Sequence, residues 1–274
     1  MHRDREVFLD DQRFHYTEWG DPMADSVLFL HGVTGHARSW DDEALVLSKT
    51  WHVVALDQRG HGDSAPAPNG DYTTPALAGD LAAFVDALGL EPARIVALSM
   101  GGRVAIAYAG LHPDGVDRLV VVDIGPEVAA AGRARVGAMM ARTPERFATL
   151  DEALALSRAN NPRYTEAMLC HRVRHGTRPV PGGFAWKYDR ALRDAVRSGK
   201  WRDPIDLWPL WRAITCPILL VRGADSDVLS AEIAKQMLAE NPAARLVEVA
   251  GAGHTVPGDQ PAVFRALLDE FLAA

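Results

Sequence analysis

The sequence predicts an α/β fold with a doubly wound, mostly parallel sheet. Short apolar runs recur along the chain and alternate with segments of helical period. The runs are nearly continuous, which is typical of strands buried on both faces of a sheet that helices cover. Repeated β-α-β alternation then gives three layers, with right-handed connections between parallel strands.

The elements follow in order. The runs at 7–9 and 13–19, separated by Asp10, Asp11 and Gln12, predict a hairpin at the N-terminus. Apolar stripes at helical spacing and capping residues predict the helices of the core. Buried strands are expected at 26–31, 51–57, 94–98, 116–124, 216–223 and 245–249, and core helices at 76–88, directly after 99, at 230–240 and at 260–272.

Residues 126–211 differ from the rest of the chain. The β pattern vanishes there, and 127–141, 144–160 and 188–198 have helical periodicity. This range holds fifteen Lys or Arg against nine Asp or Glu, whereas the remainder holds fourteen against twenty-seven. We therefore predict a core of two pieces, 1–125 and 212–274, with 126–211 as an inserted helical cap. Four tryptophans of the cap range either line a pocket or form the core of the cap: Trp186, Trp201, Trp208 and Trp211.

Composition excludes several classes of protein. The 274 residues suffice for one large core, and 48% hydrophobic with 24% charged residues is ordinary for a globular protein. No apolar run reaches the length of about 18 residues that a membrane span needs, and the charged N-terminus lacks the apolar stretch of a signal peptide. A net charge of −7 argues against nucleic acid as a partner.

The cysteines and the glycine-rich turns predict no cofactor. Cys170 and Cys216 lie far apart without a CxxC motif, which favours reduced thiols in a cytoplasmic protein. No His, Cys, Asp or Glu cluster has metal-ligand spacing, and Gly251-Ala252-Gly253 is too short for a dinucleotide fingerprint. The sequence leaves the oligomeric state open.

The chain is organised around residues 94–105, where an apolar run reaches Ser99 and Ala-rich helical spacing begins after it. A serine on a sharp strand-to-helix turn projects its hydroxyl above the sheet, and the strained backbone requires small neighbours. Ala97 and Gly101 meet this need, and Gly102 lets the new helix pack closely. The alternative is a serine that only caps the helix.

Several motifs together resemble the α/β-hydrolase superfamily, in particular its serine esterase-like members. The resemblance covers nearly the whole chain, and Ala97 departs from the family pattern, which has glycine there. The matching pieces are His31-Gly32 after the third strand, Asp57-x-Arg59-Gly60-x-Gly62-x-Ser64, the turn at Ser99, and Gly253-His254 before the last helix.

The resemblance implies three catalytic roles and an oxyanion hole. Ser99 would be the nucleophile and His254 its base. The backbone N–H groups of Val33 and Met100 would bind the oxyanion. His31 is better explained as a histidine that braces its loop, and Asp57 and Arg59 as partners within the structural loop that follows the strand at 51–57.

The carboxylate that orients His254 has more than one candidate. Most of the family carries it as Gly-x-x-Asp after the seventh strand, but here Ser226 fills that position, between Asp225 and Asp227. Asp123 ends the sixth strand beside the Ser99 strand, where some α/β-hydrolases place their acid. We expect Asp123, with Asp227 second and Asp225 third. A purely structural Asp123, capping the entry to the cap, is the alternative.

These features predict a serine hydrolase of a small carboxylic ester, thioester or lactone, with a small-molecule substrate as its partner. Carbon–carbon bond hydrolysis of a ring-cleavage product uses the same triad and is the alternative, since the basic cap would suit its anionic substrate. A perhydrolase is a third variant of the same site. From another class, a ligand receptor could keep the fold without needing Ser99 and His254.

Overall fold

A computed structural model describes residues 2–197 and 203–274. Its main sheet has eight strands in the order β1-β2-β4-β3-β5-β6-β9-β10, and a separate hairpin pairs β7 with β8. Only the pairs β1–β2 and β2–β4 of the main sheet are antiparallel. The strands are β1 (His2–Leu9), β2 (Gln12–Trp19), β3 (Ser26–Leu30), β4 (His52–Leu56), β5 (Ala93–Leu98), β6 (Val116–Val122), β7 (Thr177–Val180), β8 (Gly183–Trp186), β9 (Ile218–Gly223) and β10 (Ala244–Val249).

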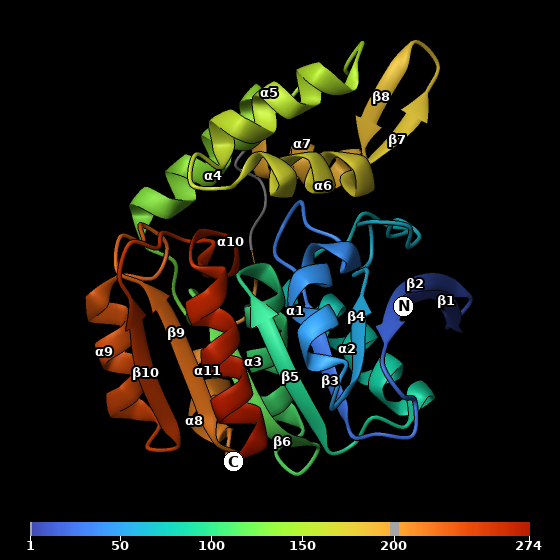
Figure 1. Cartoon of the computed structure of the whole chain (residues 1–274). Coiled ribbons are helices and arrows are strands. Elements are labelled where there is room, and N and C mark those ends of the chain that lie inside the picture. The colour runs from blue at the N-terminus through green and yellow to red at the C-terminus, as the bar shows by residue number, and fades with distance from the viewer. Residues whose placement is uncertain (1, 198–202) are drawn as a thin grey trace.

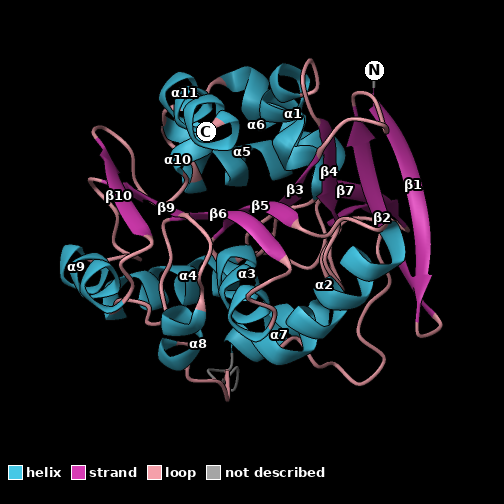
Figure 2. Cartoon of the chain, turned by 90° about the horizontal axis from the view of Figure 1, so that it is seen from below, coloured by secondary structure: helices cyan, strands magenta, loops and turns pink. Residues whose placement is uncertain are grey.

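Helices cover both faces of this sheet, so the predicted three layers are present (Figure 2). Helices α2, α3, α8 and α9 pack against one face of the sheet, and α1 and α11 pack against the other. Within the described residues no helix combines the length and apolarity that a membrane crossing requires. The helices are η1 (Ala37–Trp40), α1 (Asp41–Leu47), α2 (Thr74–Leu88), α3 (Met100–Leu111), α4 (Ala130–Arg142), α5 (Leu150–Asn160), α6 (Glu166–Gly176), α7 (Arg190–Arg197), α8 (Trp208–Ala213), α9 (Ala231–Glu240), α10 (Val256–Asp259) and α11 (Pro261–Ala273).

The predicted N-terminal hairpin is present as β1 and β2. Asp10 and Asp11 form its two-residue turn with φ of 45° and 63°. Positive φ at both central residues matches the right-handed twist of the strands, and Asp tolerates it better than most residues.

Residues 126–197, referred to below as the cap, lie over the carboxyl ends of the strands (Figure 1). The expected helices there begin later than the periodicity indicated, with α4 at Ala130, α5 at Leu150 and α7 at Arg190. The expectation that 126–211 holds no β structure is wrong, because β7 and β8 form a hairpin. Strands of four residues are too short to show a period of two.

The tryptophans of the cap range divide between two places. Trp186 lines the cavity between cap and core. Trp208 and Trp211 belong to α8, which packs in the core on the same face of the sheet as α3. The indole N–H of Trp211 donates to the Met237 carbonyl at 2.9 Å. Trp201 lies outside the described residues.

Asp57 and Arg59 have separate partners, so their expected partnership is corrected. Arg59 forms a two-point ion pair with Asp80 of α2, through Nε and Nη2. Both residues still brace the loop after β4, but each ties it to a different part of the core.

The Asp57 carboxylate is buried and collects three donors. His15 Nδ1 donates to it at 2.7 Å, the Asp63 N–H at 2.9 Å, and the Ala37 N–H makes the third contact. A Cβ at Gly62 would overlap this carboxylate, which explains the glycine and its φ of 55°. Burial raises the pKa of Asp57, but the His15 hydrogen bond and the nearby imidazoles outweigh it and hold the pKa at about 2.

Asp57→Asn should therefore lower the free energy of unfolding at pH 7 by about 2 kcal/mol or more. A carboxyl whose pKa is depressed on folding stabilises the protein above its unfolded value of 3.8, and this contribution is lost as the pH falls toward 2. Urea unfolding of both proteins between pH 3 and pH 7 should show the two stabilities converging at the acid end.

Asp86→Asn, on the exposed face of α2, is the matched control. It should unfold like the unchanged protein at every pH. A constant difference between Asp57→Asn and the unchanged protein across this range would contradict the linkage.

Candidate active site

The turn between β5 and α3 holds Ser99 in a strained conformation, with φ of 55° and ψ of −117°. Its neighbours have no room for larger side chains. A Cβ at Gly101 would lie 2.7 Å from the Leu30 carbonyl oxygen, and one at Gly102 would lie 2.4 Å from Ile124 Cγ2. Ala97 is fully buried. The small residues around Ser99 therefore let α3 pack against the sheet. The Ser99 hydroxyl lies at the carboxyl edge of the sheet.

Ser99, His254 and Asp123 meet at that edge. His254 Nε2 lies 2.9 Å from Ser99 Oγ, and His254 Nδ1 lies 2.8 Å from Asp123 Oδ2. Ser99 follows β5, Asp123 follows β6 and His254 lies on the loop after β10, so the parallel topology collects three distant segments at one edge. An imidazole placed between a hydroxyl and a carboxylate can take the hydroxyl proton and be stabilised as it becomes charged.

The Asp123 carboxylate has no solvent exposure and further donors besides His254. Its Oδ1 accepts from the Gly223 N–H at 2.9 Å, and its Oδ2 accepts from the Ser226 hydroxyl. In the sequence, Ser226 is recognisable only as the residue that fills the usual acid position. In the structure this residue donates to the carboxylate that bonds His254, which sequence spacing alone does not reveal.

The other two acid candidates turn toward the cap. Asp227 forms a two-point ion pair with Arg135 of α4, at 2.6 and 3.0 Å. Asp225 accepts from Arg163 at 3.0 Å. Of the three candidates, Asp123 is the one whose oxygen lies within hydrogen-bond distance of His254.

The two backbone donors expected to form the oxyanion hole flank Ser99. Met100 is the first residue of α3, where N–H groups have no partner within the helix. Val33 follows Gly32, and a Cβ at Gly32 would lie 3.1 Å from Ser99 Cβ. This close approach brings the loop after β3 next to the serine.

His31 braces this loop, as the sequence indicated. Its Nδ1 donates to the Gly32 carbonyl at 2.9 Å, and its Nε2 accepts from the Gln58 N–H at 3.1 Å. Burial lowers the pKa of the imidazole, so the ring is neutral at pH 7 and able to accept at Nε2.

A cavity of about 800 Å³ lies between the cap and the carboxyl edge and contains Ser99 and His254 in its wall. This volume is typical of small-molecule sites. Apolar side chains of the cap contribute much of the lining, among them Val136, Met139, Leu156, Met168 and Trp186.

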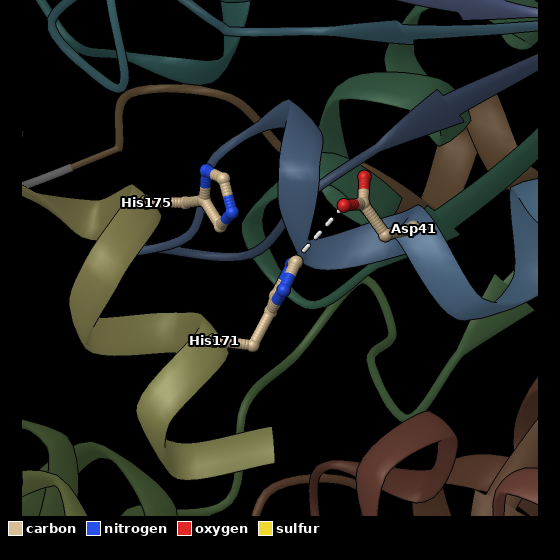
Figure 3. A group of neighbouring side chains, drawn as sticks. All are labelled: Asp41, His171 and His175. Carbon is tan, nitrogen blue, oxygen red and sulfur yellow. Dashed lines mark ion pairs between the residues drawn. The ribbon is translucent and has the colours of Figure 1, made fainter. Parts of the chain in front are cut away.

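Two groups of residues could offer ligands to a metal ion within the described part of the chain. Asp41, His171 and His175 place ligand atoms within 4.8 Å of one another, as do His15, Asp57 and Asp63. Figure 3 shows the first group, in which both histidines of α6 face Asp41 of α1. Arg38 already binds both oxygens of Asp41, at 2.7 and 2.6 Å, so this carboxylate has a cation as its partner.

Known proteins resemble the chain over most of its length. It is 33% identical over 267 residues to a 3-hydroxybutyrate-oligomer hydrolase of Cupriavidus necator, covering 91% of this chain and 89% of that protein. It is 31% identical over 260 residues to an esterase of Mycobacterium tuberculosis, covering 92% of this chain and 82% of that protein.

The solved structure of E-2-(acetamidomethylene)succinate hydrolase matches with a TM-score of 0.92 and 26% identity, covering both chains completely. The family model described as "alpha/beta hydrolase fold" matches residues 25–261. With its eight-stranded sheet and the serine turn after β5, the chain belongs to the α/β-hydrolase family and is a hydrolase.

Proposed function

We propose that the protein is a serine hydrolase that cleaves a small carboxylic ester, thioester or lactone through an acyl-enzyme. The observation that carries this proposal is the continuous contact from Ser99 Oγ through His254 to Asp123, at 2.9 and 2.8 Å. A serine hydroxyl attacks a carbonyl near neutral pH only when a base removes its proton, and His254 is positioned to do so.

In the proposed reaction, His254 Nε2 takes the proton of Ser99 Oγ as the oxygen bonds to the substrate carbonyl carbon. The oxyanion then lies between the N–H groups of Val33 and Met100, each donor lowering the barrier by about 3–4 kcal/mol. His254 returns the proton to the leaving oxygen or sulfur as its bond to carbon breaks. A water molecule repeats the sequence and releases the acid, while Asp123 stabilises the imidazolium.

The related proteins and the cavity support this choice. Two relatives are named as an esterase and as a hydrolase of 3-hydroxybutyrate oligomers. A third is named 2-(acetamidomethylene)succinate hydrolase and a fourth N-formylmaleamate deformylase. The cavity of about 800 Å³ suits a small substrate. The proposed reaction needs only the substrate and water.

The alternatives separate in two experiments. A fluorophosphonate probe labels an activated serine, so labelling of the unchanged protein but not of Ser99→Ala would exclude a receptor. Side-by-side incubation with a short p-nitrophenyl ester and with a vinylogous diketo acid distinguishes ester from carbon–carbon bond hydrolysis.

Asp123→Asn should lower kcat on p-nitrophenyl acetate by a factor of order 10⁴, because the amide no longer holds His254 in the reactive tautomer. Asp227→Asn is the matched control and should change kcat only a few-fold, since its carboxylate binds Arg135. Steady-state kinetics of both variants checks this. The reverse result would move the acid role to Asp227.

Ser226→Ala should lower kcat by about 10-fold, since hydrogen bonds to a group that orients a catalytic residue typically matter to this extent. Ser230→Ala removes a hydroxyl that caps α9, where it accepts from the Ile233 N–H at 3.2 Å, and should leave kcat unchanged. Equal kcat for Ser226→Ala and the unchanged protein would show that the Asp123 carboxylate does not need this donor.

A further inference from the structure

The arginines that line the cavity differ in their partners. Four of the five lie within 4.0 Å of a carboxyl group, whereas Arg172 has none within that distance among the described residues. The four pairs are Arg38 with Asp41, Arg135 with Asp227, Arg163 with Asp225, and Arg265 with Glu43. Within 2–197 and 203–274, Arg172 is thus the cavity arginine without a carboxyl partner.

Arg172 lies on helix α6, and His171, the residue before it, holds this helix against the core. His171 Nε2 donates to the Arg38 carbonyl at 2.9 Å and lies 3.3 Å from Asp41 (Figure 3). The following residue, Val173, is buried in the small core of the cap. Anchors on both sides define the position of Arg172, which is half-buried.

The guanidinium of Arg172 reaches the loop beside the nucleophile. Its Nη2 donates to Thr34 Oγ1 at 3.0 Å and to the Thr34 carbonyl at 3.4 Å. Thr34 is two residues from Gly32, which touches Ser99, so its Cα lies at most about 7 Å from that of Gly32. Arg172 is therefore within reach of a short chain that extends from a carbonyl bound at Ser99.

Both contacts of Arg172 with Thr34 use Nη2, so that with respect to the described residues Nε and Nη1 remain to donate to a ligand. Its charge also acts within the cavity: burial raises the pKa of Tyr164 and of Tyr188, and Arg172 opposes the shift in both. Nε and Nη1 point to different sides of the guanidinium, so a carboxylate can accept one charge-assisted hydrogen bond from either of them, and such a bond is stronger than one between neutral groups.

We propose that Arg172 binds a free carboxylate on the substrate, so that the site selects short esters or thioesters that carry an unesterified carboxyl group, on either the acyl or the leaving-group side. This inference rests on the proposed function, since it names the substrate class for that site. Arg172 does not take part in bond breaking; it holds the charged end of the substrate while the carbonyl lies at Ser99.

The kinetic test compares monomethyl glutarate with its primary amide, which has the same shape without the charge. The unchanged protein should show a kcat/KM about 10- to 100-fold higher for the acid, as expected for charged hydrogen bonds. Arg172→Met should reduce this ratio to about one, and Arg172→Lys should restore part of it. Arg174→Met, an exposed position on the same helix, should keep the full ratio.

A second pair, 4-acetoxybutyrate and its primary amide, carries the charge on the leaving-group side. An Arg172-dependent preference for the acid in either pair supports the proposal and assigns the side. A ratio near one in both pairs overturns it. If Arg172→Met lowers both members of a pair equally, Arg172 only supports the Thr34 loop and the proposal is wrong.

Binding separates this inference from the proposed reaction. In Ser99→Ala, calorimetry should find the acid bound about 10-fold or more tightly than the amide, and Ser99→Ala/Arg172→Met should bind both alike. If the unchanged protein hydrolyses no ester but this binding preference holds, the proposed reaction fails and the carboxylate site stands. Equal binding of acid and amide to Ser99→Ala overturns the carboxylate site, whatever the protein hydrolyses.

Discussion

The buried carboxylate of Asp123 is the group on which the candidate site depends. It follows β6, yet its donors come from Gly223 at the end of β9, from Ser226 beyond it, and from His254 after β10. A carboxylate without solvent exposure is very unfavourable unless hydrogen bonds replace its hydration. The hydrogen bonds that stabilise this buried charge also connect the ends of three strands. They fix the orientation of the His254 ring toward Ser99.

Backbone strain gathers at the same edge of the sheet. Among the described residues other than glycine, positive φ occurs at the hairpin turn and at Thr34, Ser99 and Asp123. Each such residue costs on the order of 1–3 kcal/mol, and it persists where the surrounding packing overdetermines the backbone. The largely buried strands β3 and β6, on either side of β5, provide that packing. The cap adds its own constraint, because Arg135 and Arg163 pair with acids of the core, whereas Arg172 has no carboxyl group within 4.0 Å among the described residues.

Much of the fold and part of the candidate site could be predicted from the sequence. The buried strands, the N-terminal hairpin and the serine turn follow from local pattern, and the motif at Gly253-His254 located the second residue of the site. The hairpin β7–β8 was not predicted, because its strands are too short to show the alternating pattern of a β-strand. The predicted pairing of Asp57 with Arg59 is wrong. A pattern of charges on one loop does not reveal that Asp57 binds His15 and that Arg59 binds Asp80.

By itself, the sequence determined what depends on neighbours along the chain: the alternation of strands and helices, and the small residues that let Ser99 occupy its turn. Steric limits of this kind act between residues close together in the chain, so they can be predicted from the sequence. Only the tertiary structure decided that Asp123 rather than Asp227 contacts His254, and that Arg172 has no carboxyl partner in the part of the chain that the structure describes. The physical reason is that hydrogen bonds and ion pairs depend on distances of a few ångströms between residues that lie far apart in the chain.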